Sequence, residues 1–168
     1  VNHCVSVVRK GEGLAPATVD ALAGKRIVAQ QGDIMHDFAV EHGLSERLAV
    51  VDSQKEVLRL LAQGEYDCAL VSRLTALYWI KKNGWDNLSV GKQPLLSPEY
   101  CYAVPQNHKA LLAQLGEGLK VLDETGEYRR IYEKWMGVYE AAPPAFTTIL
   151  RYIGIIGIPA IMLLLGSF

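Results

Sequence analysis

Residues 26–33, RIVAQQGD, join a strand pattern directly to the start of a helix. The short apolar run predicts a buried strand, and Gly32 allows the tight turn that follows it. Asp33 is suited to cap the next helix, and Gly43 is placed to end that helix. This stretch therefore predicts one strand–turn–helix unit.

The same order of strand and helix continues along the chain. A strand at 48–51 is followed by residues 53–56, SQKE, which form a capping box for a helix that ends at Gly64. A short apolar strand at 67–71 precedes a helix at 74–82. Strands that alternate with helices of about ten residues predict parallel pairing, with helices on both faces of the sheet. We expect an α/β fold whose ligands bind beyond the carboxyl ends of the strands.

Further elements flank this unit on both sides. We expect strands at 5–9, 88–91 and 100–104, and helices at 18–22, 109–124 and 127–136. The last two helices carry apolar faces for which the predicted strands leave no obvious sheet to cover. We therefore expect that part of a second lobe is absent from this chain.

The composition is that of a folded globular protein. The chain has 168 residues, of which 50% are hydrophobic and 21% charged, and its formal net charge is −1. A chain without a basic surplus cannot neutralise a row of phosphates, which argues against nucleic acid as the main partner. The cysteines and histidines lack the spacing of a metal site, so we expect neither a metal nor a cofactor.

The C-terminal segment is almost uncharged. Residues 149–168 are long enough, at ~1.5 Å rise per residue, to cross a hydrocarbon core of ~30 Å, and they predict a transmembrane helix. The alternative is a buried core helix at the C-terminus. Residues 138–148 contain Pro143 and Pro144 and predict a stiff linker. Both ends of the sequence look cut, which suggests a piece of a longer protein.

Four motifs resemble, in order and spacing, the bacterial extracellular solute-binding proteins of family 3. They are VVRK at 7–10, LAGKRIVAQQG at 22–32, the DSQ…LAQGEYD pattern within 52–67, and LDETGEYRRIYEKW at 122–135. The resemblance covers residues 1–137 and implies the type 2 periplasmic-binding-protein fold, which binds polar amino acids and similar solutes between two lobes.

The resemblance also implies a division of the chain into domains. Residues 11–99 would be one complete lobe, whereas residues 1–10 and 100–137 would be crossover strands and part of the other lobe. A solute-binding domain followed by a membrane span is similar to the sensor region of bacterial hybrid histidine kinases. This implies a periplasmic body, an inner-membrane anchor and a receptor homodimer. The alternative is a membrane-tethered solute-binding protein for amino-acid transport.

The turn formed by Gln30, Gly32 and Asp33 is the first candidate ligand site, because a helix N-terminus favours an anion. In the family a hydroxyl residue follows the glycine and holds the ligand carboxylate, but here Asp33 takes that position. A carboxylate there implies a cationic or amine-bearing ligand, or helix capping alone.

The end of the strand at 67–71 is the second candidate site. Family members often place an aspartate there that pairs with the ligand's amino group, whereas this chain has Ser72 and then Arg73. Ser72 could contact ligand or cap the next helix. Arg73 could bind an anionic group of the ligand or lie in solvent.

Catalysis needs a nucleophile with a base, a metal, or suitably spaced carboxylates, and the sequence offers none of these patterns. We therefore expect a binding protein and no catalytic residues. Because the resemblance implies that the two crossover strands lie side by side, Cys4 and Cys101 could form a disulfide, or could both be free thiols.

Overall fold

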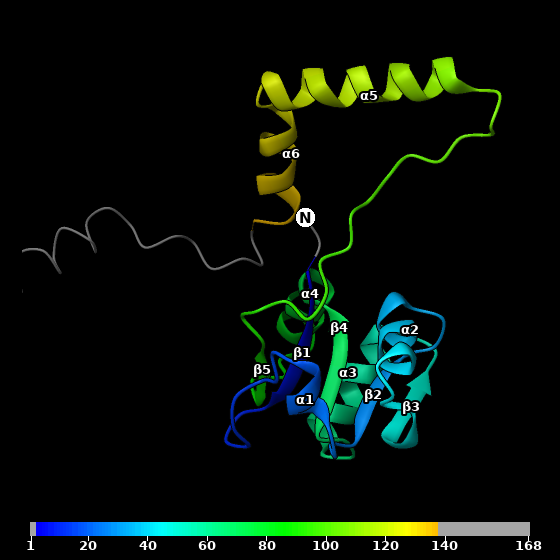
Figure 1. The fold of residues 1–168 in the computed structure, drawn as a ribbon. Helices are drawn as coiled ribbons and strands as arrows, with labels where there is room; N and C mark the ends of the chain where they lie inside the picture. The colour runs from blue at the N-terminus through cyan, green and yellow to red at the C-terminus, as the bar shows by residue number, and fades with distance from the viewer. Residues whose placement is uncertain (1–2, 138–168) are drawn as a thin grey trace, which may run out of the picture. The chain divides into compact units, whose positions relative to one another are not determined.

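A single mixed sheet of five strands forms the centre of the fold, in the order β3–β2–β4–β1–β5 (Figure 1). The computed structural model describes residues 3–137. The strands are β1 (Cys4–Arg9), β2 (Ile27–Gln30), β3 (Leu48–Val51), β4 (Cys68–Ser72) and β5 (Leu88–Val90). β2 pairs in parallel with β3 and β4, and β1 is antiparallel to β4 and β5. The predicted α/β alternation is confirmed for the three parallel strands.

The helices begin and end close to the positions that the capping signals predict. They are α1 (Val19–Leu22), α2 (Ile34–Glu41), α3 (Gln54–Gln63), α4 (Arg73–Asn83), α5 (Lys109–Glu124) and α6 (Glu127–Trp135), with a short 3₁₀ helix at Ser45–Arg47. The Ser53 hydroxyl accepts a hydrogen bond from the Glu56 amide at 3.3 Å, and Gly64 ends α3 in the left-handed region at φ 91°.

Two apolar layers form the core, one on each face of the sheet. Because successive strand residues point to opposite faces, Ile27 and Ala29 of β2 join the layer that includes residues of α1 and α2. Val28 joins the layer on the other face, which includes residues of α3 and α4. Leu58 of α3 is completely buried there. Full burial of one such leucine stabilises the fold by ~1.5–3 kcal/mol, so the core fixes the sheet on which the polar groups described below are carried.

The N-terminal strand differs from the domain division expected from the resemblance. β1 pairs with β4 and β5 in the sheet of residues 11–99, so residues 4–9 contribute to this sheet. The expected strand at 100–104 is wrong, because no strand is assigned there. The backbone of Cys4 is instead bonded to Leu96, from Cys4 N to Leu96 O at 2.8 Å. The place beside Cys4 is thus taken by Leu96 and not by residues 100–104.

The cysteines do not form the disulfide that was considered. Cys4 and Cys68 are buried free thiols, and Cys101 is an exposed free thiol. The strand that would have carried Cys101 to the side of β1 is absent, which explains why the two sulfur atoms are unpaired.

α5 and α6 match the predicted helices at 109–124 and 127–136 to within one residue. Large apolar side chains on both helices are exposed, among them Leu111, Leu119, Leu122, Ile131 and Trp135. The assignment of residues 100–137 to a second lobe stays a prediction.

The predicted membrane span at 149–168 and the linker at 138–148 lie outside the described residues. Within residues 3–137, none of the helices combines the length and the apolar character needed to cross a bilayer.

Candidate functional site

The carboxyl ends of β2, β3 and β4 meet at one edge of the sheet because the three strands are parallel. The antiparallel strand β1 begins at this edge, where Cys4 lies opposite Ser72. We call this the carboxyl-end edge and define it by Gln30, Gly32, Asp33, Ser72 and Arg73. The five predicted site residues therefore lie at one edge, around the ends of β2 and β4.

The turn after β2 is held by backbone hydrogen bonds. The Gln31 amide donates to the Val51 carbonyl at 2.8 Å, and the Asp33 amide donates to the Gln30 carbonyl at 3.3 Å. Gly32 adopts φ +69°, which side-chain-bearing residues rarely adopt, and its amide donates to His36 Nδ1 at 3.2 Å. The turn thus sets the direction in which α2 leaves the sheet.

Asp33 caps α2, as the capping alternative predicted. Its Oδ1 accepts a hydrogen bond from the Met35 amide at 3.0 Å. Its Oδ2 accepts a second hydrogen bond, from Gln54 Nε2 at 2.6 Å. Both carboxylate oxygens of Asp33 therefore have a partner, and one of these partners comes from α3.

Gln54 continues the connection to β4. Its Oε1 accepts a hydrogen bond from the Ser72 amide at 3.2 Å. Asp33 and Ser72, which are distant in sequence, are thus joined through one side chain. Asp33, Gln54 and Ser72 thus form one hydrogen-bonded series.

Sequence reasoning missed Gln54 as a site residue. It interpreted residues 53–56 only as a capping box, and the cap itself is present. The available signal was the position of Gln54 at the first turn of the helix that follows β3, directly beside the carboxyl ends of the parallel strands.

Ser72 and Arg73 lie where β4 passes into α4. Ser72 occupies the N-cap position of α4, is 9% exposed and makes no capping hydrogen bond with its side chain. The Arg73 amide donates to the His3 carbonyl at 2.8 Å. The Arg73 side chain is half-buried, and its Nε is buried without a hydrogen-bond partner among the described residues. Arg73 was expected either to bind an anion or to lie in solvent, and its side chain is only partly exposed to solvent.

The Asp33 carboxylate also affects the pKa of Cys4, the first residue of β1. Burial, followed by the nearby Asp33 carboxylate, raises the pKa of the Cys4 thiol to about 11. Cys4 is therefore protonated at neutral pH and is not a reactive nucleophile. Among the described residues, no group of three or more His, Cys, Asp or Glu side chains could hold a metal ion.

A shallow depression of ≈ 500 Å³ lies at the end of β3. Its lining residues are Val50, Val51, Asp52, Ser53 and Glu56. Space for a small solute is therefore present beside the first turn of α3.

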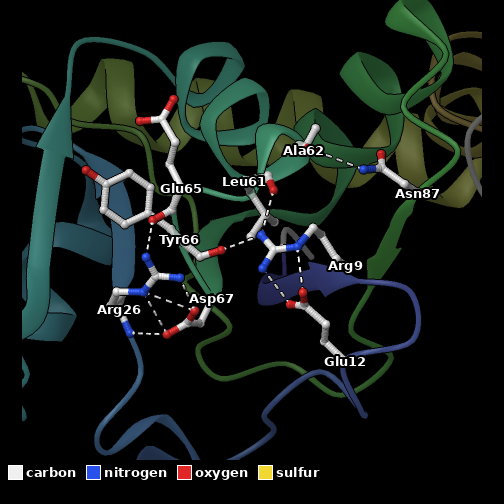
Figure 2. Close-up of polar contacts among 9 residues, drawn as sticks. All are labelled: Arg9, Glu12, Arg26, Leu61, Ala62, Glu65, Tyr66, Asp67 and Asn87. Carbon is white, nitrogen blue, oxygen red and sulfur yellow. Dashed lines mark hydrogen bonds and ion pairs between the residues drawn. The ribbon is translucent and has the colours of Figure 1, made fainter.

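The opposite edge of the sheet, which we call the amino-end edge, is occupied by ion pairs (Figure 2). Arg26 precedes β2 and Asp67 precedes β4, and their side chains meet at 2.6 Å between Arg26 Nη2 and Asp67 Oδ1. The Arg26 amide also donates to Asp67 Oδ2 at 2.9 Å. These hydrogen bonds from Arg26 lower the pKa of Asp67 to about 2. Asp67 therefore has a structural role, because it ties the start of β2 to the start of β4.

Arg9, at the end of β1, closes the same edge (Figure 2). Its Nη1 donates to the carbonyl of Leu61 at 2.9 Å and to that of Tyr66 at 2.5 Å. Its Nη2 pairs with Glu12 at 2.6 Å. Asn87 donates to the Ala62 carbonyl at 2.9 Å. Arg9 and Asn87 thus bind carbonyls in the last turn of α3, at Leu61 and Ala62, and Arg9 also binds the Tyr66 carbonyl in the segment that follows.

No protein-family profile matches the chain. Among solved structures, a histidine kinase sensor domain with similarity to periplasmic binding proteins is 32% identical, with a TM-score of 0.71, and the match covers 81% of this chain and 59% of that domain. A mutant of ArgBP from T. maritima is 27% identical, with a TM-score of 0.67, over 81% of this chain and 58% of that protein.

An ancestral arginine-binding protein bound to glutamine is 24% identical, with a TM-score of 0.66, and supports the fold alone. It matches over 81% of this chain and 60% of its own length. The chain thus spans about three fifths of the length of each of these structures. The sheet and its helices match the periplasmic-binding-protein fold over that part, and the resemblance stated from the sequence is confirmed.

Proposed function

We propose, on the premise that this chain has the periplasmic-binding-protein fold, that it is the extracytoplasmic solute-binding part of a bacterial transmembrane signalling protein, a sensor histidine kinase. The observation that carries the proposal is the 32% identity and TM-score of 0.71 to a histidine kinase sensor domain. The polar groups at the carboxyl-end edge support it, because ligands of open α/β sheets bind at this end of the strands.

The ligand we propose is a small amino-acid-like or amine-bearing solute. Asp33 places a carboxylate at the turn after β2, and a carboxylate attracts an ammonium or guanidinium group. Arg73 offers a buried guanidinium nitrogen at the neighbouring strand end, which suits an anionic group of the same solute. The match to ArgBP, which has been solved with arginine bound, agrees with this class of solute.

Signalling would follow from a change in the arrangement of two lobes. A solute shifts such an equilibrium only as far as it prefers one arrangement over the other. In this proposal the solute binds in the periplasm, and the preferred arrangement acts through a span at 149–168 in the inner membrane, within a receptor dimer. The chain itself would bind without catalysing a reaction.

The test is a binding screen followed by an output measurement on the full-length protein. The twenty standard amino acids and small amines are tested for a rise in melting temperature, which a ligand of the folded state must produce. We expect at least one solute to bind and to change the output of the protein in membranes. If no solute binds, or if a bound solute leaves the output unchanged, the sensor function is wrong.

A membrane-tethered transport protein is the second candidate. It is the alternative that the sequence left open, and the match to an amino-acid transporter substrate-binding protein, 19% identical with a TM-score of 0.66, supports the fold alone and does not choose between the two functions. The two functions differ in what the solute does. Solute-dependent phosphorylation by the full-length protein supports the sensor, whereas solute-dependent uptake without phosphorylation supports the transport protein.

A further inference from the structure

Gln54 is the only side chain in the described residues that is hydrogen-bonded to both Asp33 and Ser72. It comes from α3, whereas Asp33 precedes α2 and Ser72 ends β4. Gln54 is half-buried, so its position depends on these hydrogen bonds as well as on packing. One amide group therefore joins three elements at the carboxyl-end edge.

The orientation of the Gln54 amide is determined by its two partners. The ionised Asp33 carboxylate can only accept hydrogen bonds, so it must face the NH₂ group of Gln54. The Ser72 amide can only donate, so it must face the oxygen of Gln54. A carboxylate at Asp33 thus dictates which atom of Gln54 reaches β4.

We propose that Gln54 is a positioning residue of the solute site, oriented by Asp33 so that it holds the end of β4 in place beside the turn after β2. This inference rests on the proposed function and deepens it. Gln54 sets the spacing between Asp33 and Arg73, the two charged groups to which that function assigns the solute. A change in the orientation of Gln54 weakens solute binding without unfolding the sheet.

An exchange of side chains between positions 33 and 54 tests this arrangement. In Asp33→Asn, the new NH₂ group faces the NH₂ group of Gln54, and a flip of Gln54 would place a donor against the Ser72 amide. In Gln54→Glu, two carboxylates face each other. The double variant Asp33→Asn/Gln54→Glu restores both hydrogen bonds, because Asn donates to Glu and Glu accepts from Ser72. The capping hydrogen bond to Met35 can form in all of these proteins.

Two readouts are measured on the full-length protein. The first is hydrogen exchange of the Ser72 amide, which needs no solute. The second is the dissociation constant for the tightest binder among the twenty standard amino acids and agmatine. Gln63→Glu is the matched control, because it makes the same chemical change in the same helix, at an exposed position.

We expect each single variant to speed exchange of the Ser72 amide and to weaken binding about tenfold. The double variant should return exchange to within about threefold of the unchanged protein, and its affinity should lie above that of Asp33→Asn alone but below that of the unchanged protein, because the Asp33 carboxylate no longer contacts the solute. Wild-type affinity in both single variants overturns the positioning role but leaves solute binding intact. Exchange of the Ser72 amide that stays fast in the double variant also overturns it, because the exchanged side chains would then not hold the end of β4. If the unchanged protein binds none of the probes, the proposed function fails together with the inference.

Discussion

The two edges of the sheet hold polar side chains in different ways. At the amino-end edge, Arg26 is paired with Asp67, and Arg9 is paired with Glu12 and with the carbonyls of Leu61 and Tyr66 (Figure 2). At the carboxyl-end edge, one carboxylate is held by a backbone amide and a glutamine, and the Arg73 Nε lacks a partner among the described residues.

We infer from this difference that the amino-end edge contributes mainly to stability and the carboxyl-end edge mainly to solute binding. Ion pairs and carbonyl bonds that are complete within the fold stabilise the sheet and offer little to a solute. A carboxylate with further acceptor capacity, and a guanidinium nitrogen without a partner among the described residues, can gain interactions when a solute binds. The comparison predicts that changes at the amino-end edge alter unfolding, whereas changes at the carboxyl-end edge alter binding.

The largest expected effect comes from Arg9→Met. The variant leaves the carbonyls of Leu61 and Tyr66 without their charged donor, in a side-chain environment where Arg9 is only 16% exposed. We expect a loss of about 2 kcal/mol in the free energy of unfolding, measured by urea denaturation, with solute affinity unchanged. Glu12→Gln is the control, because it removes the ion pair but keeps Arg9. A loss of solute affinity in Arg9→Met with unchanged stability would contradict the assignment of the amino-end edge to stability.

The next effect is expected from Asp33→Asn. Asparagine caps a helix as well as aspartate does, so the urea midpoint should change little. Solute affinity, measured by calorimetry, should fall about tenfold because the charge is lost and Gln54 is no longer oriented. Affinity equal to that of the unchanged protein would remove Asp33 from the site.

Asp67→Asn makes the same chemical change at the other edge and should affect pH dependence. The pKa of Asp67 in the folded protein is about 2, below the value of about 3.9 for an unfolded chain. The ion pair with Arg26 therefore stabilises the fold fully above about pH 4, and this stabilisation is lost as the pH falls toward 2. The variant should show a flatter dependence of unfolding on pH in this range, with binding at pH 7 unchanged. An equally steep acid dependence would contradict this assignment.

The smallest effect is expected from Glu12→Gln. The Glu12 side chain is 47% exposed, and its pairing with Arg9 is screened by water. We expect a change below about 1 kcal/mol in the free energy of unfolding, which decreases further in 1 M salt. A loss as large as that of Arg9→Met would mean that Arg9 acts mainly through this ion pair.

Local signals in the sequence were sufficient to predict the elements of the sheet. Ser53 and Gly64 begin and end α3 as their side-chain chemistry requires, and the strand at 48–51 matches β3. Such signals depend on residues close in sequence. The expected strand at 100–104 was wrong because strand formation also needs a partner, which alternation of side chains cannot provide.

The candidate site was only partly predictable for the same reason. Gln30 and Ser72 end strands that were identified as parallel, and Asp33 follows one of them, so their common edge could be predicted. The hydrogen bonds of Gln54 depend on how α3 lies between β2 and β4, which is a tertiary fact. The position of Gln54 at the first turn after β3 indicated the edge of the sheet at which it lies, but not the partners that its side chain binds.

Hydrogen exchange of the full-length protein, with and without the tightest-binding solute, shows whether the solute binds at the carboxyl-end edge. We expect the solute to slow exchange around residues 30–36 and 70–74, at the carboxyl-end edge, and to leave residues 61–67 at the amino-end edge unchanged. Slower exchange confined to residues 61–67, or unchanged exchange at the carboxyl-end edge under saturating solute, would contradict this prediction.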